Sequence, residues 1–307
     1  MTARTEQFTE LRSLLFAIAY RILGSVTEAE DAVQETWIRY ESTPTEPTSP
    51  KAFLSAVVTR ISIDVLRSAR VRREAYVGDW FPEPLLDDPY DDPARAAELA
   101  DSVSMASLIL LERLSPLERA VFVLREVFAF GFDDIAVAVG RSQDACRQLA
   151  VRARRHVRDG RPRFEADRRA REELSARFFE ALREGDVEGL QELLAADVEL
   201  VGDGGGKAPQ FARAVSGVDK VTRLLASMVP LISAIDGTIE PHEVNGQPGA
   251  VFRARDGVLN VWSLDVLDGR IQTIRAVLNP DKLEHLGPVA DPYAALDEAK
   301  AARRQAR

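Results

Sequence analysis

A basic helical hairpin between Phe132 and His156 constrains this chain more than any other stretch. Apolar residues recur there at three- and four-residue spacing through Val139, which predicts a helix with one buried face. Gly140 then ends that helix, and Ser142 stands where the N-cap of a second helix belongs. This order predicts a helix-turn-helix, whose second helix enters the DNA major groove. An ordinary helical hairpin with a solvated arginine face is the alternative.

Charge is distributed unevenly along the 307 residues, whose formal net charge is −9. Residues 141–171 hold eleven arginines and four acidic residues, whereas residues 79–101 hold eight acidic residues and one arginine. Local charge determines which surface attracts phosphate, so the basic stretch is expected to meet nucleic acid and the acidic one to avoid it. The single cysteine, Cys146, lies in the second helix and is expected to be a packing residue.

The length of the chain allows two or three domains, each with an ample core. No run of residues approaches the length of a transmembrane helix, and the N-terminus lacks a signal pattern, so a cytoplasmic protein with no membrane contact is expected. The three histidines have no metal-ligand spacing. Neither a metal nor a cofactor is therefore expected.

Three amphipathic helices are predicted near the N-terminus. The first, from residue 6, ends at Gly24, and a capping box from Thr27 to Glu30 is expected to open the second, which runs through Tyr40. The second helix leaves an acidic, partly aromatic face outward. The third helix, residues 52–73, finishes with a cluster of arginines, which suits contacts with nucleic-acid phosphates.

The order of these parts resembles that of the bacterial sigma factors of the extracytoplasmic-function (ECF) group. The matching segments are AEDAVQETW (29–37), the I-D-x-x-R pattern that begins at Ile63, LSPLERAVFVLREVFAFGFDDIAVAVG (114–140) and S-x-x-x-C-R-Q-L-x-x-R-A-R from Ser142. The resemblance covers residues 8–75 and 105–160. It implies two partners: core RNA polymerase, through its β′ clamp and β flap, and promoter DNA.

The resemblance also assigns residues to three surfaces. The helix that docks on the polymerase clamp is matched by Asp31, Gln34, Glu35 and Trp37. The helix that reads and helps to open the −10 promoter element is matched by Arg60, Asp64, Arg67, Arg70, Arg72 and Arg73. The helix that reads the −35 element is matched by Arg141, Ser142, Gln143, Asp144, Arg147, Gln148, Arg152 and Arg155.

A further stretch of about 140 residues follows the DNA-reading helix, where most members of that group end. Its pattern predicts helices over 172–194, interrupted at Gly185, a strand at 196–200, a helix at 217–228 and strands with Asp-Gly turns over 251–280. Helices followed by a curved antiparallel sheet resemble a SnoaL-like α+β cone domain, a fold that commonly encloses a pocket. The expected fold is therefore multidomain: two all-α sigma domains and then an α+β domain.

Five segments are expected along the chain. They are a helical region-2 domain at 1–75, an acidic and extended linker at 76–104, a helix-turn-helix region-4 domain at 105–163, a SnoaL-like domain at 164–287 and a tail at 288–307.

Three motifs connect the linker with the C-terminal domain. YVGDWFPEPL (76–85), DGGGK (203–207) and NPDKL (279–283) resemble signatures of ECF sigma factors that carry such an extension. The glycine run lacks the spacing of a phosphate-binding loop. Since glycines permit a close backbone approach, the run is expected to be a docking loop. The residues expected to regulate the domains are Trp80, Pro82, Glu83, Pro84, Asp203, Gly204, Gly205, Gly206, Lys207, Asn279, Pro280, Asp281 and Lys282.

These observations predict a sigma factor that is not an enzyme and whose activity is modulated in cis by its C-terminal domain. The alternative is a helix-turn-helix regulator fused to a ligand-binding or catalytic SnoaL-like domain. In that case Asp203, His242, Trp262 and Asp265 would line a polar pocket. Whether a small ligand binds the C-terminal domain stays open at this point.

Overall fold

The computed structural model describes residues 3–90, 96–158, 167–209 and 214–305. Its contacts divide the chain into two compact units. The helical unit comprises Met1–Ala75 and Asp88–Pro162, and the sheet unit comprises Tyr76–Asp87 and Arg163–Arg307. The expected linker is thus divided, because its first residues belong to the sheet unit. The expected boundary between residues 163 and 164 lies outside the described residues.

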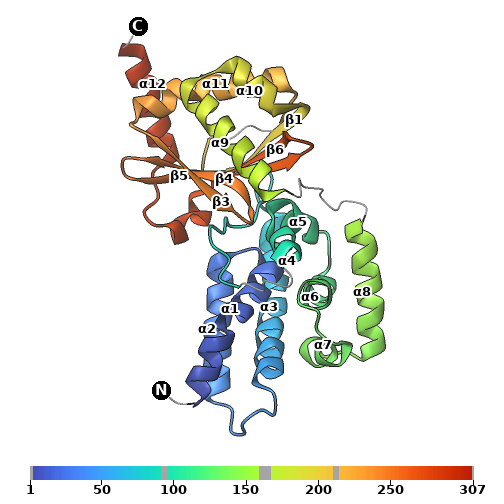
Figure 1. The fold of residues 1–307 in the computed structure, drawn as a ribbon. Coiled ribbons are helices and arrows are strands. Elements are labelled where there is room, and N and C mark those ends of the chain that lie inside the picture. Colours follow the sequence, from blue (N-terminus) through green and yellow to red (C-terminus); the bar gives the residue numbers. More distant parts are fainter. Residues whose placement is uncertain (1–2, 91–95, 159–166, 210–213, 306–307) are drawn as a thin grey trace. The chain divides into compact units, whose positions relative to one another are not determined.

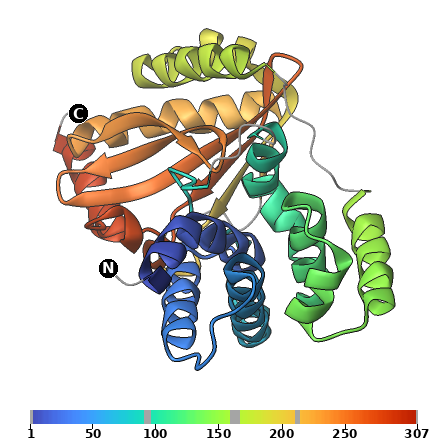
Figure 2. The same ribbon diagram turned by 60° about the horizontal axis from the view of Figure 1, so that its bottom comes forward.

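Three helices form the first part of the helical unit: α1 (Ala3–Leu23), α2 (Val26–Glu41) and α3 (Pro50–Glu74) (Figures 1 and 2). Gly24, with φ +70°, ends α1 as expected. The predicted capping box at Thr27 is wrong. Ser25 caps α2 instead, accepting from the amide of Glu28 at 3.0 Å, because the tight turn at Gly24 leaves Ser25 as the extended residue and puts Thr27 inside the first turn.

The second part of the helical unit comprises α4 (Ala96–Val103), α5 (Met105–Leu111), α6 (Pro116–Phe122), the π-helical turn η1 (Val123–Val127), α7 (Phe132–Val139) and α8 (Gln143–Arg158). The acidic segment is extended only up to residue 90, and α4 departs from the extended conformation expected there. A helix forms because AAELADSV places Leu99 and Val103 four residues apart, and both are buried.

The sheet unit begins with α9 (Arg168–Glu184) and α10 (Val187–Leu193). The remaining elements are β1 (Leu194–Asp203), β2 (Val215–Ser216), α11 (Val218–Ala234), β3 (Thr238–Val244), β4 (Gln247–Ala254), β5 (Gly257–Leu267), β6 (Arg270–Val277), η2 (Pro280–Lys282), η3 (Glu284–Leu286) and α12 (Pro292–Gln305). Figures 1 and 2 show α9 and α11 on the same face of the sheet.

The strand order is β2-β1-β6-β5-β4-β3, and the sheet is mixed, which corrects the expected antiparallel sheet. β1 pairs in parallel with β6, whereas the other pairs are antiparallel. β1 and β6 can run parallel because no tight turn joins them: β2, α11 and β3–β5 lie between them in the chain. Two of the hairpin turns, Asn245–Gly246 and Asp268–Gly269, have positive φ at both residues, as type I′ turns require.

The core of the sheet unit lies between the sheet and the helices. Phe178 and Phe179 of α9 pack in the same buried cluster as Phe252 of β4 and Trp262 of β5, whose ring centroids are 4.4 Å apart. Aromatic side chains therefore fill the face of the sheet that α9 and α11 cover. β3 was absent from the expected strands because Pro241 interrupts its pattern; an edge strand tolerates this proline.

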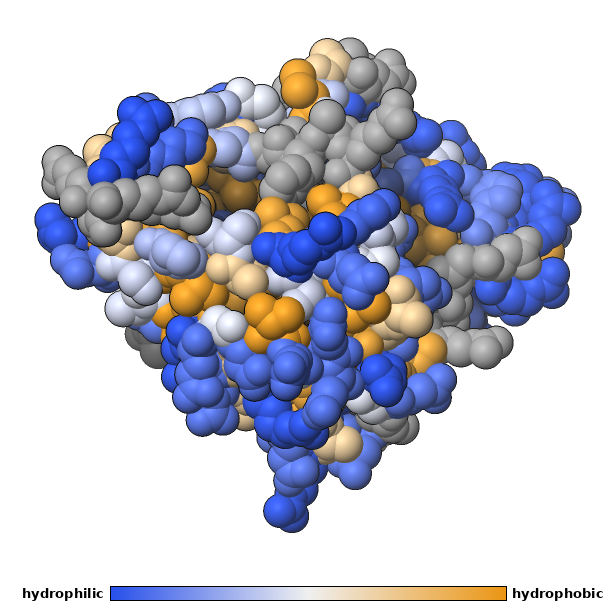
Figure 3. All heavy atoms as spheres, turned by 90° about the horizontal axis from the view of Figure 1, so that it is seen from above, coloured by the Kyte–Doolittle hydropathy of each residue, from blue (hydrophilic) through white to orange (hydrophobic). Residues whose placement is uncertain are grey.

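Within the described ranges, no helix has the length and hydrophobicity needed to cross a membrane. On the face drawn in Figure 3, hydrophobic residues are interspersed with hydrophilic ones, which is ordinary for the surface of a globular protein.

Candidate functional site

Asp203, at the end of β1, is fully buried and holds the linker segment through its carboxylate. Its Oδ1 accepts from the phenol of Tyr76, and its Oδ2 accepts from the backbone amide of Phe81 at 2.8 Å. Its carbonyl accepts from the amides of Leu278 and Asn279 at 2.7 and 2.9 Å. A single residue therefore joins the linker to the C-terminal ends of β1 and β6.

Lys282 completes the charge balance at Asp203. Its ammonium lies 2.6 Å from Asp203 Oδ2 and also donates to the carbonyl of Phe81. It lies 4.7 Å from the ring centre of Tyr76 and 4.4 Å from that of Trp80, distances typical of cation–π contacts. Because both charged groups are buried, these extra partners are what make the ion pair tolerable.

The phenol of Tyr76 remains a hydrogen-bond donor at any physiological pH. Burial, the hydrogen bond to Asp203 and the Asp203 charge raise the pKa of Tyr76 far above its ordinary value. Asn279 donates to the phenol oxygen at 2.8 Å, so this oxygen both donates and accepts. Tyr76, Phe81, Asp203, Asn279 and Lys282 are named the linker clasp here.

The glycine run is where the linker approaches most closely. A Cβ on Gly205 would lie 2.4 Å from Asn279 Nδ2 and 2.7 Å from the Tyr76 phenol, and φ at Gly205 is +57°. A Cβ on Gly206 would lie 3.4 Å from the Cβ of Val77. Glycine is thus required at 205 by both conformation and space.

The remaining motif residues lie around the clasp with different degrees of exposure. Pro82, Pro84 and Gly204 are buried, and Glu83 and Pro280 are partly buried. Lys207 and Asp281 form an ion pair at 2.5 Å whose side chains are both more than half exposed, so it contributes little to stability.

Three other contacts of the linker lie outside the motifs of the C-terminal domain. The amide of Leu85 donates to Asn245 Oδ1 at 3.0 Å, and the amide of Asn245 donates to the carbonyl of Leu85 at 2.7 Å. A ring nitrogen of His285 lies 2.7 Å from the carbonyl of Pro84. Asn245 and His285 were missed because a single polar residue in a turn carries no signal of a distant partner.

The helix-turn-helix forms as predicted. Gly140 has φ +64°, and the amide of Ala145 donates to Ser142 Oγ at 3.2 Å. Cys146 is buried, and its burial raises the pKa of its thiol, which agrees with a packing role. The residues expected at the −35 element are exposed at or near the N-terminal half of α8: Arg141, Ser142, Gln143, Asp144, Arg147 and Gln148.

Several arginines of this surface have partners in the helical unit. Arg147 pairs with Asp144 at 2.5 Å and lies 5.5 Å from the ring centre of Phe132. Arg152 donates to Glu118 at 3.1 Å, so its guanidinium also supports the fold. Arg155 is exposed.

Three of the arginines expected at the −10 element bond to residues in the second part of the helical unit. Arg60 donates to the carbonyls of Val137 and Ala138 at the end of α7. Arg70 donates to the carbonyl of Leu114, and Arg73 pairs with Glu112 at 2.6 Å. Arg67 pairs with Asp64 on the exposed side of α3. The side chain of Arg72 lies outside the described part.

Glu112 joins the two parts of the helical unit, because it pairs with Arg73 of α3 and with buried Arg119 of α6. Burial raises the pKa of Glu112, but Arg119 and Arg73 outweigh it and hold this pKa below its ordinary value. The native state therefore binds this proton less readily than the unfolded state does. Its stabilisation is present above the ordinary glutamate pKa and is lost as the pH falls through the lowered value.

We expect the free energy of unfolding of the helical unit to fall on acidification below the ordinary glutamate pKa of about 4.3. Denaturant titrations at several pH values measure this. Glu112→Gln should flatten the dependence, and an unchanged slope in this variant would contradict the assignment.

The residues expected to dock on polymerase all lie on α2. Asp31 and Gln34 are exposed, and Glu35 and Trp37 are partly buried. Trp37 packs on Phe8 of α1 with ring centres 5.0 Å apart, which fixes its orientation. Trp37 thus presents an aromatic side chain of fixed orientation on α2.

The four residues of the catalytic alternative do not line a common pocket. Asp203 is engaged in the linker clasp, Trp262 packs in the core, and Asp265 is buried and paired with Arg275. His242, by contrast, lines a groove beside α9. In the described part of the chain, no group of three or more histidine, cysteine and acidic residues is placed to hold a metal ion.

Three family models match the chain: Sigma-70 region 2 over residues 7–72, Sigma-70 region 4 over 109–157 and the SnoaL-like domain over 175–281. The chain is 38% identical to the ECF RNA polymerase sigma factor SigJ of Mycobacterium tuberculosis over 90% of its own length and 92% of that protein. It is 30% identical to a probable ECF RNA polymerase sigma factor, SigI, of the same species over 90% and 93%.

Among solved structures, the crystal structure of SigJ is similar, with a TM-score of 0.70 and 34% identity. The match covers 91% of this chain and 98% of the SigJ chain. The similarity therefore includes the C-terminal domain as well as both sigma regions.

Proposed function

The chain belongs to the ECF RNA polymerase sigma factors, and we propose that its linker clasp controls when it can direct polymerase to a promoter. In this proposal α2 docks on the polymerase clamp, α3 acts at the −10 element and α8 reads the −35 element. The protein acts where chromosome and polymerase meet, in the cytoplasm.

The observation that carries the regulatory part is the burial of Asp203 and Lys282 around the backbone of Phe81. A linker between two promoter-reading domains has to follow a path on the polymerase. The same residues cannot lie in the clasp and on another surface at once, so the two states exclude each other. Any partner that binds one state better shifts the population toward it.

The contacts of Arg60, Arg70 and Arg73 indicate that the helical unit also has to change before it binds the promoter. Guanidinium groups that donate to backbone carbonyls of the helical unit have fewer N–H groups left for phosphates. We therefore infer that the two parts of this unit separate before α3 engages the −10 element.

The proposal gives the C-terminal domain a regulatory role and no catalytic one. The dispersal of Asp203, Trp262, His242 and Asp265 over different surroundings supports this. Turnover of a small molecule by the full-length chain would favour the catalytic alternative.

Transcription reconstituted with core polymerase tests the proposal. We expect promoter-specific transcripts only when polymerase and the chain are both present, and weak binding of the chain alone to duplex promoter. Tight binding without polymerase would instead support an independent helix-turn-helix regulator.

Two substitutions in α8 should separate sequence reading from phosphate binding. Gln148→Ala should weaken holoenzyme binding to the cognate −35 sequence by about 1–3 kcal/mol and leave a mutated sequence less affected, if its amide meets a base edge. Arg155→Ala should weaken holoenzyme binding to the two sequences equally, and should lower the slope of log K against log salt concentration by about one. Filter binding or anisotropy over a salt series measures this; equal effects of both variants on both sequences would contradict the assignment.

A further inference from the structure

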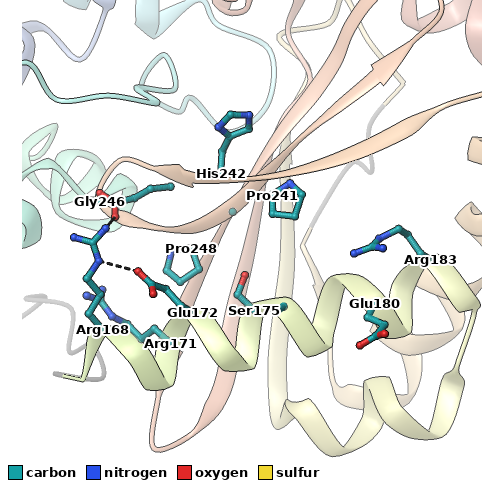
Figure 4. A pocket seen from close by; sticks show the side chains of 13 residues that line it. Arg168, Arg171, Glu172, Ser175, Glu180, Arg183, Pro241, His242, Gly246 and Pro248 are labelled. Carbon is teal, nitrogen blue, oxygen red and sulfur yellow. Dashed lines mark hydrogen bonds and ion pairs between the residues drawn. The ribbon is translucent and has the colours of Figure 1, made fainter.

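A groove of about 520 Å³ lies between α9 and the β3–β4 hairpin (Figure 4). The helix lines it from Arg168 to Arg183, and the hairpin lines it with residues around Pro241 and Gly246. Ser175 and Arg183 project from α9 toward the hairpin. The groove is distinct from the interior of the sheet unit, which Phe178, Phe252 and Trp262 fill.

Two buried hydrogen-bond donors beside this groove have no acceptor among the described residues. Arg171, which lines the groove, donates through Nη1 to Gln247 Oε1 at 2.8 Å, while its Nε is buried and unpartnered. Gln247 is only 1% exposed, and its Nε2 is also unpartnered. Buried donors are nearly always satisfied in native proteins, so an acceptor of two N–H groups is expected here.

Three arginines and three glutamates line the groove, so a preference for an anionic acceptor can arise only locally, at Arg171. Arg168 pairs with both Glu172 and Glu243, each at 2.8 Å, so its single positive charge offsets half of the charge of these two carboxylates. Among the described residues, the hydrogen-bond acceptor of Arg171 is the neutral Gln247. A carboxylate matches a guanidinium and an amide donor in both charge and geometry.

The walls of the groove also offer apolar surface to the body of a ligand. Ala176, Pro241 and Pro248 line it, and a second hollow of about 330 Å³ shares Arg183 and is lined by Leu182, Ile232 and Ile239, among others. The two hollows together follow β3, the edge strand. Since Pro241 lacks an amide hydrogen, an added peptide strand would pair poorly there, which favours a small molecule.

The turn of the same hairpin holds the linker. Asn245 exchanges two hydrogen bonds with Leu85, its neighbour Gly246 lines the groove, and Gln247 bonds to Arg171. Three consecutive residues therefore connect the groove with the linker.

We propose that this groove binds a small organic carboxylate with an apolar body, and that its binding changes how firmly the linker is held. The second part rests on the proposed control by the linker clasp.

Octanoate is a suitable probe, with octanamide as its neutral counterpart, and ligand-observed NMR on the full chain measures binding. We expect octanoate to bind at least tenfold more tightly than octanamide. Arg171→Gln should weaken octanoate at least tenfold, whereas Arg177→Gln, an exposed position on the same helix, should not. Gln247→Glu should also abolish octanoate binding, because the new carboxylate would pair with Arg171 inside the protein. The unfolding temperature of this variant should stay unchanged.

Amide exchange of residues 76–87 in the presence of octanoate tests the connection to the linker. We expect its rate to change in the parent chain and not in Arg171→Gln. Octanoate binding that is equal to octanamide binding, or independent of Arg171 and Gln247, would overturn the site. Bound octanoate with unchanged exchange would overturn the connection. Neither result decides whether the linker clasp controls transcription, which clasp variants report separately.

Discussion

Replacing Asp203 by alanine is expected to release residues 76–87 from the sheet unit and to lower its free energy of unfolding by about 3–5 kcal/mol. The carboxylate accepts from Tyr76, Phe81 and Lys282, and all three donors lose their acceptor together. The Lys282 ammonium would then be a buried charge without a counter-ion. Denaturant unfolding measures the loss, and amide exchange of residues 76–87 reports the release.

Asp281→Ala is the matched control. It also removes a carboxylate that pairs with a lysine of the same motifs, but this pair is exposed. Exposed pairs contribute about 0–1 kcal/mol, so the linker should remain protected in this variant. Equal effects of the two substitutions would show that the buried ion pair is not what holds the linker.

Gly205→Ala is expected to disrupt the same region for a steric reason. An alanine there would adopt a left-handed conformation, which costs about 1–2 kcal/mol, and its methyl group would overlap Asn279 Nδ2 and the Tyr76 phenol. The phenol would have to move away from Asp203, and Asn279 Nδ2 from the phenol. The total loss should exceed the conformational cost by about 1–3 kcal/mol, the usual penalty of overpacking.

Gly269→Ala isolates the conformational cost. Gly269 has a similar φ of +66°, lies in the β5–β6 turn, and a Cβ there would meet nothing within 4 Å. The difference between the two variants in denaturant unfolding therefore measures the close approach alone. A difference near zero would mean that the glycine run serves its own backbone conformation and not the linker.

Much of the fold could be predicted from local sequence patterns. The boundaries at Gly24, Gly140 and Gly185 follow from glycine ending a helix with positive φ, which depends on neighbouring residues only. The parallel pairing of β1 with β6 could not be predicted in this way. It depends on the order in which distant strands join the sheet, and no local pattern encodes that order.

The linker clasp, too, could be predicted from the sequence only in part. Motif resemblance placed Asp203, Lys282 and the glycine run at the docking site, but said nothing of what each touches. Tyr76 lies 127 residues from Asp203 in the chain, and His285 lies 201 residues from Pro84. Contacts at such separation depend on packing of the whole sheet unit. The orphan donors at Arg171 and Gln247 are likewise visible only in three dimensions.

A reversible covalent link between the linker and the glycine loop tests the central claim most directly. A Cβ at Gly206 would lie 3.4 Å from that of Val77, close to the separation of about 3.5–4.5 Å found in disulfides. Both positions are exposed, and the native Cys146 is buried, so Val77→Cys with Gly206→Cys offers one new disulfide. The single-cysteine variants are the controls.

Promoter-specific transcription with core polymerase is then measured for the oxidised and the reduced double variant. If the linker has to leave the clasp, transcription should fall strongly on oxidation and return on reduction, while the single variants respond to neither. Equal transcription by the oxidised, cross-linked protein and its reduced form would contradict control by the linker clasp.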